Sequence, residues 1–400
     1  MGRERLHKLL AELIRQQGSD LHIKVGSPPK IRVNGSLRAI PNMDSPTPVD
    51  TATMAASIMS ETIRKQFEES NDADFAYAWA EVGRFRVNAF RQRGSVAMVF
   101  RHVSTSAVSL DDLGLPAVVE RLADEQRGLV LVTGPTGSGK TTTLAAIIDH
   151  INHTRDCHII TIEDPIEVLH RDGRASINQR EIGVDADSFA RAMRGAMRQD
   201  PDVILVGEMR DEETVRAALG AAETGHLVLS TLHTIDATET ISRIVDFFPP
   251  HQHSQTRHSL AGTLRGTICQ RLVATIDGDA RVAALEVMIV NGRVQQCIVD
   301  AGKTAALDEI IADGEYYGMR TFDQSLADLY GASQIDLNHA MSAASKPHDL
   351  KVELQLRGYL DSNGKVIEGS VGAGQDAPSE SADVSSDLLS HLAALQSPPV

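Results

Sequence analysis

The chain of 400 residues has few cysteines and no long apolar run. Its three cysteines, Cys157, Cys269 and Cys297, lie far apart without C-x-x-C spacing, which argues against a disulfide framework and against a structural zinc site. No signal-peptide pattern is present, and no apolar stretch approaches the roughly 18 to 20 residues that span a bilayer. We therefore expect a cytoplasmic chain without direct membrane insertion, whose membrane association must come through a partner.

Positive charge is also scarce. The chain has 39 Lys and Arg against 54 Asp and Glu, a net charge of −15. The negative electrostatic field of such a chain argues against general binding to nucleic acid or to an anionic bilayer. We therefore expect no nucleic-acid partner. The length and a hydrophobic content of 42% allow more than one core, and a single domain is not expected.

The order of apolar and polar segments divides the chain into parts. A small α+β domain is expected over residues 1–103, where helical patterns mix with short alternating strands. A polar linker over 104–109 precedes residues 110–275, where helices alternate with short apolar runs, the pattern of a parallel sheet with helices on both faces. A mostly helical part follows over 276–363. The Ser-, Gly- and Pro-rich segment 364–400 is predicted to be disordered.

Within these parts, the apolar spacing predicts individual elements. One helix is expected at about residues 51–69. Four buried strands are expected at 129–132, 159–162, 203–206 and 227–229. In an open parallel sheet, functional groups gather at the carboxyl ends of the strands, so the residues that follow these runs are the candidates for chemistry.

The most specific motif follows the first of these strands. Gly134 to Thr141 reads G-P-T-G-S-G-K-T and opens directly into a helical pattern. Its glycines let backbone N–H groups turn inward around a polyphosphate, Lys140 reaches the terminal phosphates, and the Thr141 hydroxyl ligates Mg²⁺. The helix N-terminus favours anions. The predicted nucleotide-binding residues are Gly134, Pro135, Thr136, Gly137, Ser138, Gly139, Lys140, Thr141 and Thr142.

Two acids follow later strands. Glu163, in the sequence Glu163-Asp164-Pro165, can act as a general base on water, although a helix-capping acidic turn has the same pattern. Glu208 closes the run D-V-I-L-V-G-E and is expected to face Mg²⁺, partly through water. Many buried strands end in an acid, so it is the place of Glu208 after the phosphate loop that favours this role.

A histidine and a group of arginines complete the set of candidates. His233 ends the strand that begins at Leu227 and is expected to sense the γ-phosphate, although a lone histidine is more often structural. Arginines concentrate on the last strands of the first domain: Arg84, Arg86, Arg91, Arg93 and Arg101. They either protect edge strands from aggregation or act as arginine fingers on a neighbouring subunit's nucleotide.

Taken together, the motifs resemble the type II/IV secretion ATPase superfamily. G-P-T-G-S-G-K-T, I-T-I-E-D-P-I-E, P-D-V-I-L-V-G-E-M-R-D and T-G-H-L-V-L-S-T-L-H-T are similar to its Walker A motif, aspartate box, Walker B motif and histidine box. The segments S-D-L-H-I-K-V-G, R-F-R-V-N-A-F, R-V-A-A-L-E-V-M and G-M-R-T-F-D-Q-S-L extend the resemblance to the PilT-like, type IV pilus retraction branch, over roughly residues 5 to 350.

The resemblance implies a PAS-like α+β domain, a RecA-like P-loop ATPase domain and a homohexamer that couples ATP hydrolysis to pilin disassembly and twitching motility. The implied partners are an inner-membrane pilus platform protein and a second retraction or assembly ATPase. Motif matching makes Glu163 the catalytic glutamate, Glu208 the Walker B acid and His233 the histidine-box sensor. Arg86 and Arg101 match the paired arginines that reach the nucleotide.

The sequence departs from the retraction branch at one helix. Retraction members carry A-I-R-N-L-I-R-E where residues 294–301 read V-Q-Q-C-I-V-D-A, so Gln296 and Asp300 replace both arginines. The lack of a tetracysteine zinc module and of a long N-terminal extension nevertheless favours retraction. The alternatives are an accessory PilU-like motor, an assembly or type II secretion ATPase, a RecA-like nucleic-acid motor, and a scaffold that binds ATP without hydrolysing it.

Overall fold

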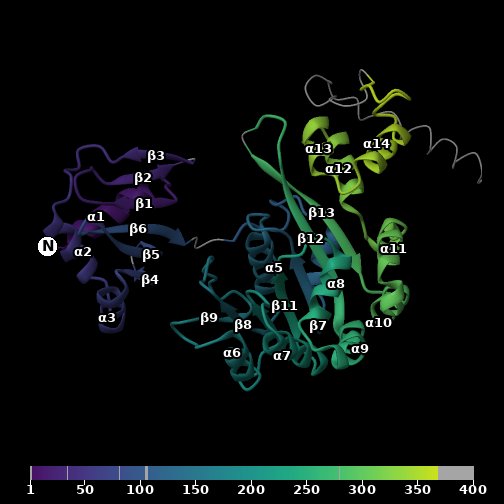
Figure 1. Ribbon diagram of the computed structural model, residues 1–400, viewed down its shortest axis with the longest axis horizontal. Helices are drawn as coiled ribbons and strands as arrows, with labels where there is room; N and C mark the ends of the chain where they lie inside the picture. Colours follow the sequence, from purple (N-terminus) through teal and green to yellow (C-terminus); the bar gives the residue numbers. More distant parts are fainter. Residues whose placement is uncertain (1, 34, 81, 104–106, 279, 368–400) are drawn as a thin grey trace, which may run out of the picture. The chain divides into compact units, whose positions relative to one another are not determined.

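The computed structural model describes residues 2–33, 35–80, 82–103, 107–278 and 280–367. The predicted linker at 104–109 lies partly, and the predicted disordered tail at 364–400 almost wholly, outside these residues. The described residues form helices and two β-sheets (Figure 1).

The first sheet is antiparallel and has six strands in the order β3-β2-β1-β6-β5-β4. The strands are β1 (Asp20–Ile23), β2 (Lys30–Val33), β3 (Ser36–Ala39), β4 (Asp72–Trp79), β5 (Gly83–Gln92) and β6 (Ser95–Val103). In β5 the alternate residues Phe85, Val87 and Ala89 are fully buried, as expected of a strand with one face on a core. Helix α1 (Gly2–Arg15) adds four buried leucines to the same core.

The single helix predicted at 51–69 is wrong, because this segment forms two helices, α2 (Pro48–Ala56) and α3 (Glu61–Ser70). Ser60 is the N-cap of α3, and its hydroxyl accepts a hydrogen bond from Ile63 N. Such a cap satisfies an amide that has no partner within the helix. The apolar spacing continues across the break, so spacing alone predicts one helix.

The second sheet has seven strands in the order β13-β12-β7-β11-β10-β8-β9. The strands are β7 (Gly128–Thr133), β8 (His158–Glu163), β9 (Ser176–Glu181), β10 (Val203–Val206), β11 (Leu227–Leu232), β12 (Leu264–Ala274) and β13 (Arg281–Ile289). The pairs β10–β11, β11–β7, β12–β7 and β8–β9 are parallel, and β12–β13 is antiparallel. The predicted α/β fold class, a parallel sheet preceded by a small α+β domain, is confirmed.

Three strands of this sheet, β9, β12 and β13, were not predicted. Polar residues such as Gln270 and Arg271 interrupt the apolar pattern of β12. The part predicted as mostly helical, 276–363, begins with β13 before its helices follow. The helices that accompany the second sheet are α4 (Ala117–Ala123), α5 (Lys140–Thr154), α6 (Phe189–Ala196), α7 (Glu212–Glu223), α8 (Ala237–Asp246), α9 (His253–Thr263), α10 (Gly292–Val299), α11 (Leu307–Ala312), α12 (Phe322–Gly331), α13 (Leu337–Ala343) and α14 (Pro347–Leu356).

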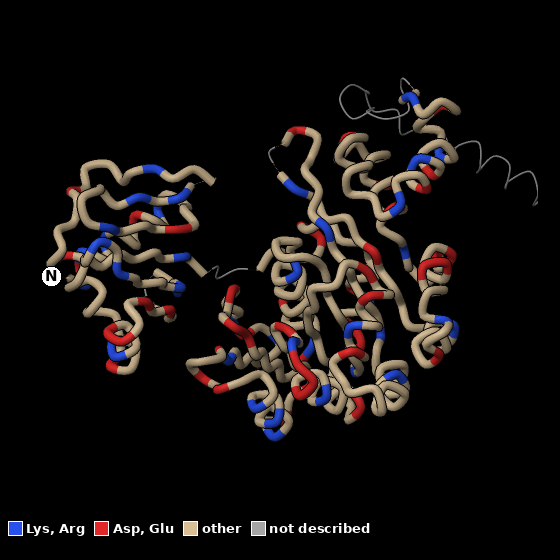
Figure 2. The backbone as a smooth tube through the Cα atoms, in the orientation of Figure 1, with Lys and Arg blue, Asp and Glu red and all other residues tan. Residues whose placement is uncertain are grey.

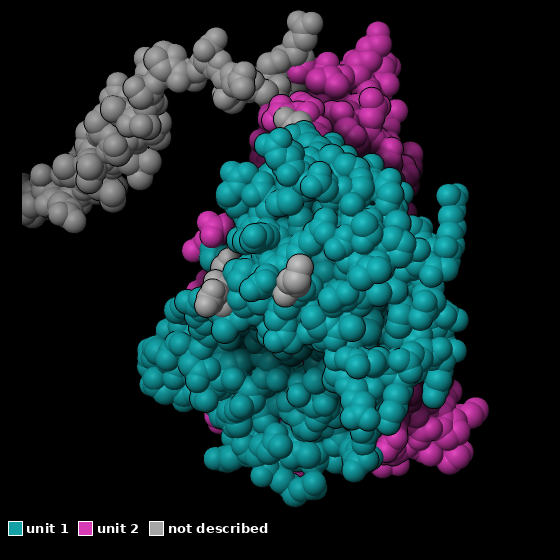
Figure 3. All heavy atoms as spheres, turned by 90° about the vertical axis from the view of Figure 1, so that its left-hand side faces the viewer, with its two compact units in different colours: residues 1–109, 148–201 teal, residues 110–147, 202–400 magenta. Residues whose placement is uncertain are grey.

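The chain forms two compact units, which Figure 3 shows in different colours. Unit 1 comprises residues 1–109 and 148–201, and unit 2 comprises residues 110–147 and 202–400. The strands β8 and β9 therefore belong to the same unit as the N-terminal sheet. The domain boundaries predicted from the sequence follow a different criterion, the change in segment pattern, and remain a prediction.

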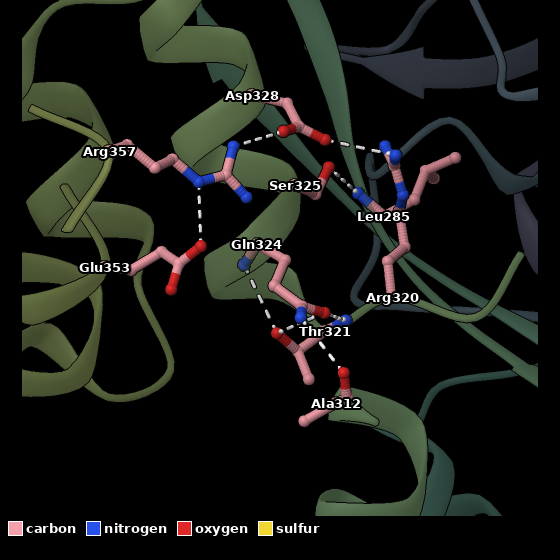
Figure 4. Close-up of polar contacts among 9 residues, drawn as sticks. All are labelled: Leu285, Ala312, Arg320, Thr321, Gln324, Ser325, Asp328, Glu353 and Arg357. Atoms are coloured by element: carbon pink, nitrogen blue, oxygen red, sulfur yellow. Dashed lines mark hydrogen bonds and ion pairs between the residues drawn. The ribbon is translucent and has the colours of Figure 1, made fainter. Parts of the chain in front are cut away.

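In unit 2, helix α12 is tied to β13 and to α14 by polar contacts (Figure 4). The Ser325 hydroxyl accepts a hydrogen bond from Leu285 N in β13 over 3.1 Å. The Asp328 carboxylate pairs with Arg320 at 3.1 Å and with Arg357 of the residues after α14 at 2.5 Å. Asp328 therefore links α12 both to Arg320, which precedes this helix, and to Arg357 at the end of α14.

Charge is mixed along the described chain. In Figure 2, segments with Lys and Arg are interspersed among segments with Asp and Glu. The acidic excess is therefore spread out rather than gathered in one block. In the described ranges, no helix combines the length and the apolar character that crossing a membrane requires.

We expect Glu286→Gln to raise thermal stability near pH 8 but not near pH 5. Burial raises the pKa of Glu286 from 4.5 to about 7, although a hydrogen bond from Ala237 N at 2.8 Å favours the charged form. The stability that the protonated group contributes is present below pH 4.5 and lost as the pH rises through about 7. Glutamine cannot ionise, so the variant should keep this stability at high pH. Melting temperatures of both proteins at the two pH values test this, and a pH-independent difference would contradict it.

Candidate functional site

The predicted phosphate loop lies between β7 and α5 in unit 2. Its crest, Pro135–Gly137, is exposed, whereas Ser138 and Lys140 are buried. Gly137 and Gly139 have φ angles of +80° and +90°, which residues with a Cβ atom rarely adopt. The expected order of strand, glycine-rich loop and helix is therefore present, with glycines where the backbone requires them.

The loop packs against Gln270 of β12, a residue that the sequence analysis did not single out. A Cβ atom added at Gly134 would lie 2.4 Å from Gln270 O, and one added at Gly139 would lie 2.7 Å from Gln270 Nε2. Thr143 Oγ1 donates a hydrogen bond to Gln270 Oε1 over 2.8 Å. Gln270 is 3% exposed, and a buried amide needs such partners. The sequence carries no signal for this contact, because polar residues interrupt the apolar pattern of β12.

We expect Gly134→Ala to lower both thermal stability and nucleotide affinity more than Gly137→Ala. Both positions have positive φ, which costs about 1–2 kcal/mol for a residue with Cβ. The new methyl group at Gly134 would also meet the backbone oxygen of Gln270, whereas nothing lies within 4 Å of a Cβ at Gly137. Melting temperatures and titration with a fluorescent ADP analogue measure the difference. Equal effects of the two substitutions would contradict the packing argument.

Several groups of the loop fit a polyphosphate with Mg²⁺. The buried Ser138 hydroxyl has no hydrogen-bond partner among the described residues. Thr141 and Thr142 are exposed in the first turn of α5, a helix of 15 residues whose N-terminal amides favour anions. Lys140 Nζ donates to Gly134 O at 2.8 Å and to Pro135 O at 3.0 Å. The lysine thus sits against the loop into which a phosphate would have to fit.

Glu208 and His233 come together in unit 2. Glu208 follows β10 and His233 follows β11, and these strands are parallel neighbours. His233 Nε2 lies 3.7 Å from Glu208 Oε2, and the same oxygen lies 2.7 Å from Arg210 Nε. The Glu208 side chain is 13% exposed and that of His233 is 50% exposed. The histidine at the end of one strand therefore contacts the acid at the end of the next, and Arg210 is a partner that the sequence analysis missed.

Glu163 is the last residue of β8, in unit 1, and is partly buried. Its Oε1 accepts hydrogen bonds from Thr161 Oγ1 at 2.6 Å and from Gln179 Nε2 at 3.1 Å. Burial raises the pKa of Glu163 above its ordinary value, against these two hydrogen bonds, which favour the carboxylate. A carboxyl group whose pKa is raised is a stronger base than an ordinary glutamate.

Arg86 and Arg101 face each other across neighbouring strands of unit 1. They are partners in the β5–β6 register, and both are exposed. Arg101 Nε lies 2.9 Å from Asp20 Oδ1, whereas Arg86 has no ion pair or hydrogen bond in the described part of the chain. Burial works to raise the pKa of Asp20, but hydrogen bonds from Ser19 and Arg101 hold the pKa below its ordinary value. Like charges opposite one another destabilise a sheet, so this pair is not explained by stability.

The predicted site residues thus form groups. The phosphate loop, Glu208 and His233 belong to unit 2, whereas Glu163 and the pair of arginines belong to unit 1. Their common action on one nucleotide remains a prediction.

The chain is similar to known proteins over most of its length. The family model described as "Type II/IV secretion system protein" matches residues 3–317. The type IV pilus retraction ATPase PilT of Pseudomonas aeruginosa is 44% identical over 342 residues, which cover 86% of this chain and 98% of that protein. The type IV pilus ATPase PilU of the same organism is 40% identical over 357 residues, 89% of this chain and 93% of that protein.

The fold of the chain is also similar to that of a solved structure. The crystal structure of the pilus retraction motor PilT with bound ADP superposes with a TM-score of 0.80 at 45% identity, covering 86% of this chain and 98% of that one. The family model spans well over half of the residues, and the segments similar to the Walker A motif, the aspartate box, the Walker B motif and the histidine box lie inside it. The chain therefore belongs to the type II/IV secretion system protein family.

Proposed function

We propose that this chain is a motor ATPase that hydrolyses ATP to drive type IV pilus retraction, the disassembly of pilin that powers twitching motility. The observation that carries the proposal is the phosphate loop on its β7–α5 scaffold, in a chain that covers 98% of a retraction ATPase at 44% identity. The acids Glu163 and Glu208 favour hydrolysis over mere nucleotide binding.

The proposed mechanism assigns each step to a side chain or amide of this chain. The amides of Gly137 to Lys140 and the Lys140 ammonium bind the phosphates of ATP. Thr141 and, partly through water, Glu208 hold Mg²⁺, which when bound neutralises charge on the phosphates. Glu163 accepts a proton from the attacking water. His233 reports the γ-phosphate to Glu208, with which it is already in contact at 3.7 Å.

The pair Arg86 and Arg101 supports a role for a second copy. Arginine fingers supplied by a neighbouring subunit stabilise the charge that develops during phosphoryl transfer. Two exposed arginines held opposite one another suit this task, because like charges at this spacing destabilise a sheet and only Arg101 has an ion pair, with Asp20, to offset that cost. We therefore propose a homohexamer that works at the cytoplasmic side of the inner membrane, with a pilus platform protein and a second retraction or assembly ATPase as partners.

We expect ATP turnover to depend on ring assembly. If the arginines complete a neighbour's site, the specific activity should rise steeply over the protein concentrations at which the oligomer forms. Activity and mass should be followed together across a dilution series, for example by mass photometry. A monomer with full turnover would contradict the ring mechanism.

One observation favours a second function, that of an accessory PilU-like motor. Gln296 and Asp300 stand where retraction members carry arginines. Asp300 instead ends α10 and accepts a hydrogen bond from Gly302 N at 3.0 Å, so it serves the local turn. Neither residue supplies the positive charge of the retraction segment.

The phenotype of a strain that lacks this chain would distinguish between these candidate functions. Loss of the retraction motor should leave cells with excess surface pili and no twitching. Loss of an assembly or secretion ATPase should leave cells without pili or without secretion. Loss of an accessory motor should impair retraction without abolishing it. Absence of pili after deletion would contradict the proposal.

A further inference from the structure

Glu163 is held by two side chains that face each other across a strand pair. Thr161 of β8 and Gln179 of β9 are partners in the parallel register. Both donate to the same oxygen, Oε1 of Glu163, at 2.6 and 3.1 Å. One carboxylate oxygen is thereby fixed by two donors, and no hydrogen bond to side chains is made by Oε2 among the described residues.

The amide of Gln179 is itself fixed by the loop that follows β8. Its Nε2 also donates to Val168 O at 2.9 Å, and its Oε1 accepts from His170 N at 2.9 Å. A flipped amide would place its oxygen against the Val168 carbonyl and the Glu163 carboxylate, and its NH₂ group against an N–H donor. All polar atoms of the Gln179 amide therefore have partners in one orientation only. Gln179 joins the Glu163 carboxylate to the backbone of the loop.

We propose that Gln179, together with Thr161, is a positioning residue that fixes the Glu163 carboxylate in its ionised form with Oε2 turned to the attacking water. The proposal rests on the proposed function of Glu163 as general base. It assigns to β9, a strand outside the motifs of the family, a part in setting the rate of hydrolysis.

The electrostatics around Glu163 explain why such donors are needed. Burial raises the pKa of Glu163, and the charge of Glu167 in the loop after β8 raises it further. Glu181, opposite Glu163 in the β8–β9 register, is paired with Arg84 at 2.8 Å. The hydrogen bonds from Thr161, from Gln179 and from the backbone of Glu167 act in the other direction, because they favour the carboxylate. Without them, a larger fraction of Glu163 would be protonated and unable to accept a proton.

The test is the pH profile of kcat for the full chain. Gln179→Met and Thr161→Val remove one donor each at nearly constant volume. Each should lower kcat at neutral pH by about tenfold and move the acidic limb of the profile upward by about one pH unit. The affinity for a nonhydrolysable ATP analogue should stay within about twofold, since neither residue belongs to the phosphate loop. Thr161→Ser keeps the hydroxyl and should retain the parental profile.

The matched control is Asn178→Met, the same kind of change at the neighbouring, exposed position of β9. It should leave kcat and the acidic limb unchanged. Gln179→Glu keeps the acceptor for His170 N, so it serves if Gln179→Met does not fold, and it should move the limb upward because it sets a second carboxylate against Glu163. If Glu163→Gln abolishes turnover while Gln179→Met, Gln179→Glu and Thr161→Val keep the parental profile, the inference is overturned and the proposed function stands. If Glu163→Gln keeps full turnover, the role of Glu163 is overturned as well.

Discussion

In protein carrying Glu163→Gln, ATP turnover should fall by about 10²- to 10⁴-fold while nucleotide binding is retained. The amide has the size of the carboxyl group but cannot accept a proton from water. The parent Glu163 already has a raised pKa caused first by burial, so its basicity is greater than that of an exposed glutamate. Steady-state phosphate release and titration with a fluorescent ATP analogue measure the two quantities separately.

Asp156→Asn is the matched control for this substitution. It removes a carboxylate just before the start of β8, where an exposed Asp156 pairs with Arg174 at 2.6 Å. A surface ion pair of this kind contributes at most about 1 kcal/mol. The control should retain parental turnover. Parental turnover in Glu163→Gln itself would remove Glu163 from its assigned role.

Arg86→Ala combined with Arg101→Ala should lower turnover by about 10³-fold or more, and mixing should restore part of it. The physical reason is the proposed action of these arginines on the nucleotide of a neighbouring copy. In rings co-assembled from this variant and from Lys140→Ala, some interfaces combine an intact loop from one copy with intact arginines from the other. Turnover of the mixture should exceed the sum of the two inactive proteins measured separately.

Arg93→Ala, a substitution in the exposed turn between β5 and β6, is the control for general charge loss. It should leave turnover unchanged. If the mixed rings are as inactive as their parents, the arginines act within their own subunit or not on nucleotide at all.

Much of the fold was predictable because its signals are local. The apolar runs that became β7, β8, β10 and β11 are short and continuous, and the phosphate loop is one uninterrupted motif. The break between α2 and α3 was missed because the cap at Ser60 is a weaker signal than the apolar spacing that runs through it. β12 was missed because its polar residues have partners that only the tertiary structure supplies.

In the candidate site, too, local motifs were predictable from the sequence and tertiary contacts were not. Residues that lie within their motifs, such as Lys140 and Glu163, could be predicted as candidates. Gln270 and Gln179 were not, because each acts through a contact that is distant in sequence: Gln270 lies 127 positions from Thr143, and Gln179 lies 16 positions from Glu163. A glutamine on a strand has no sequence signature that reveals which side chain it meets. Supporting residues of this kind can be identified only from the three-dimensional structure.

The hydrogen bonds of Lys140 have a consequence for the turnover cycle. Its ammonium group donates to Gly134 O and Pro135 O in this structure. In the proposed role of Lys140, an incoming triphosphate competes with these two carbonyls for the lysine, and a departing diphosphate returns the lysine to them. We expect this exchange to lower the affinity for ADP. Product release would then be fast, and the same protomer could bind a new ATP molecule without delay.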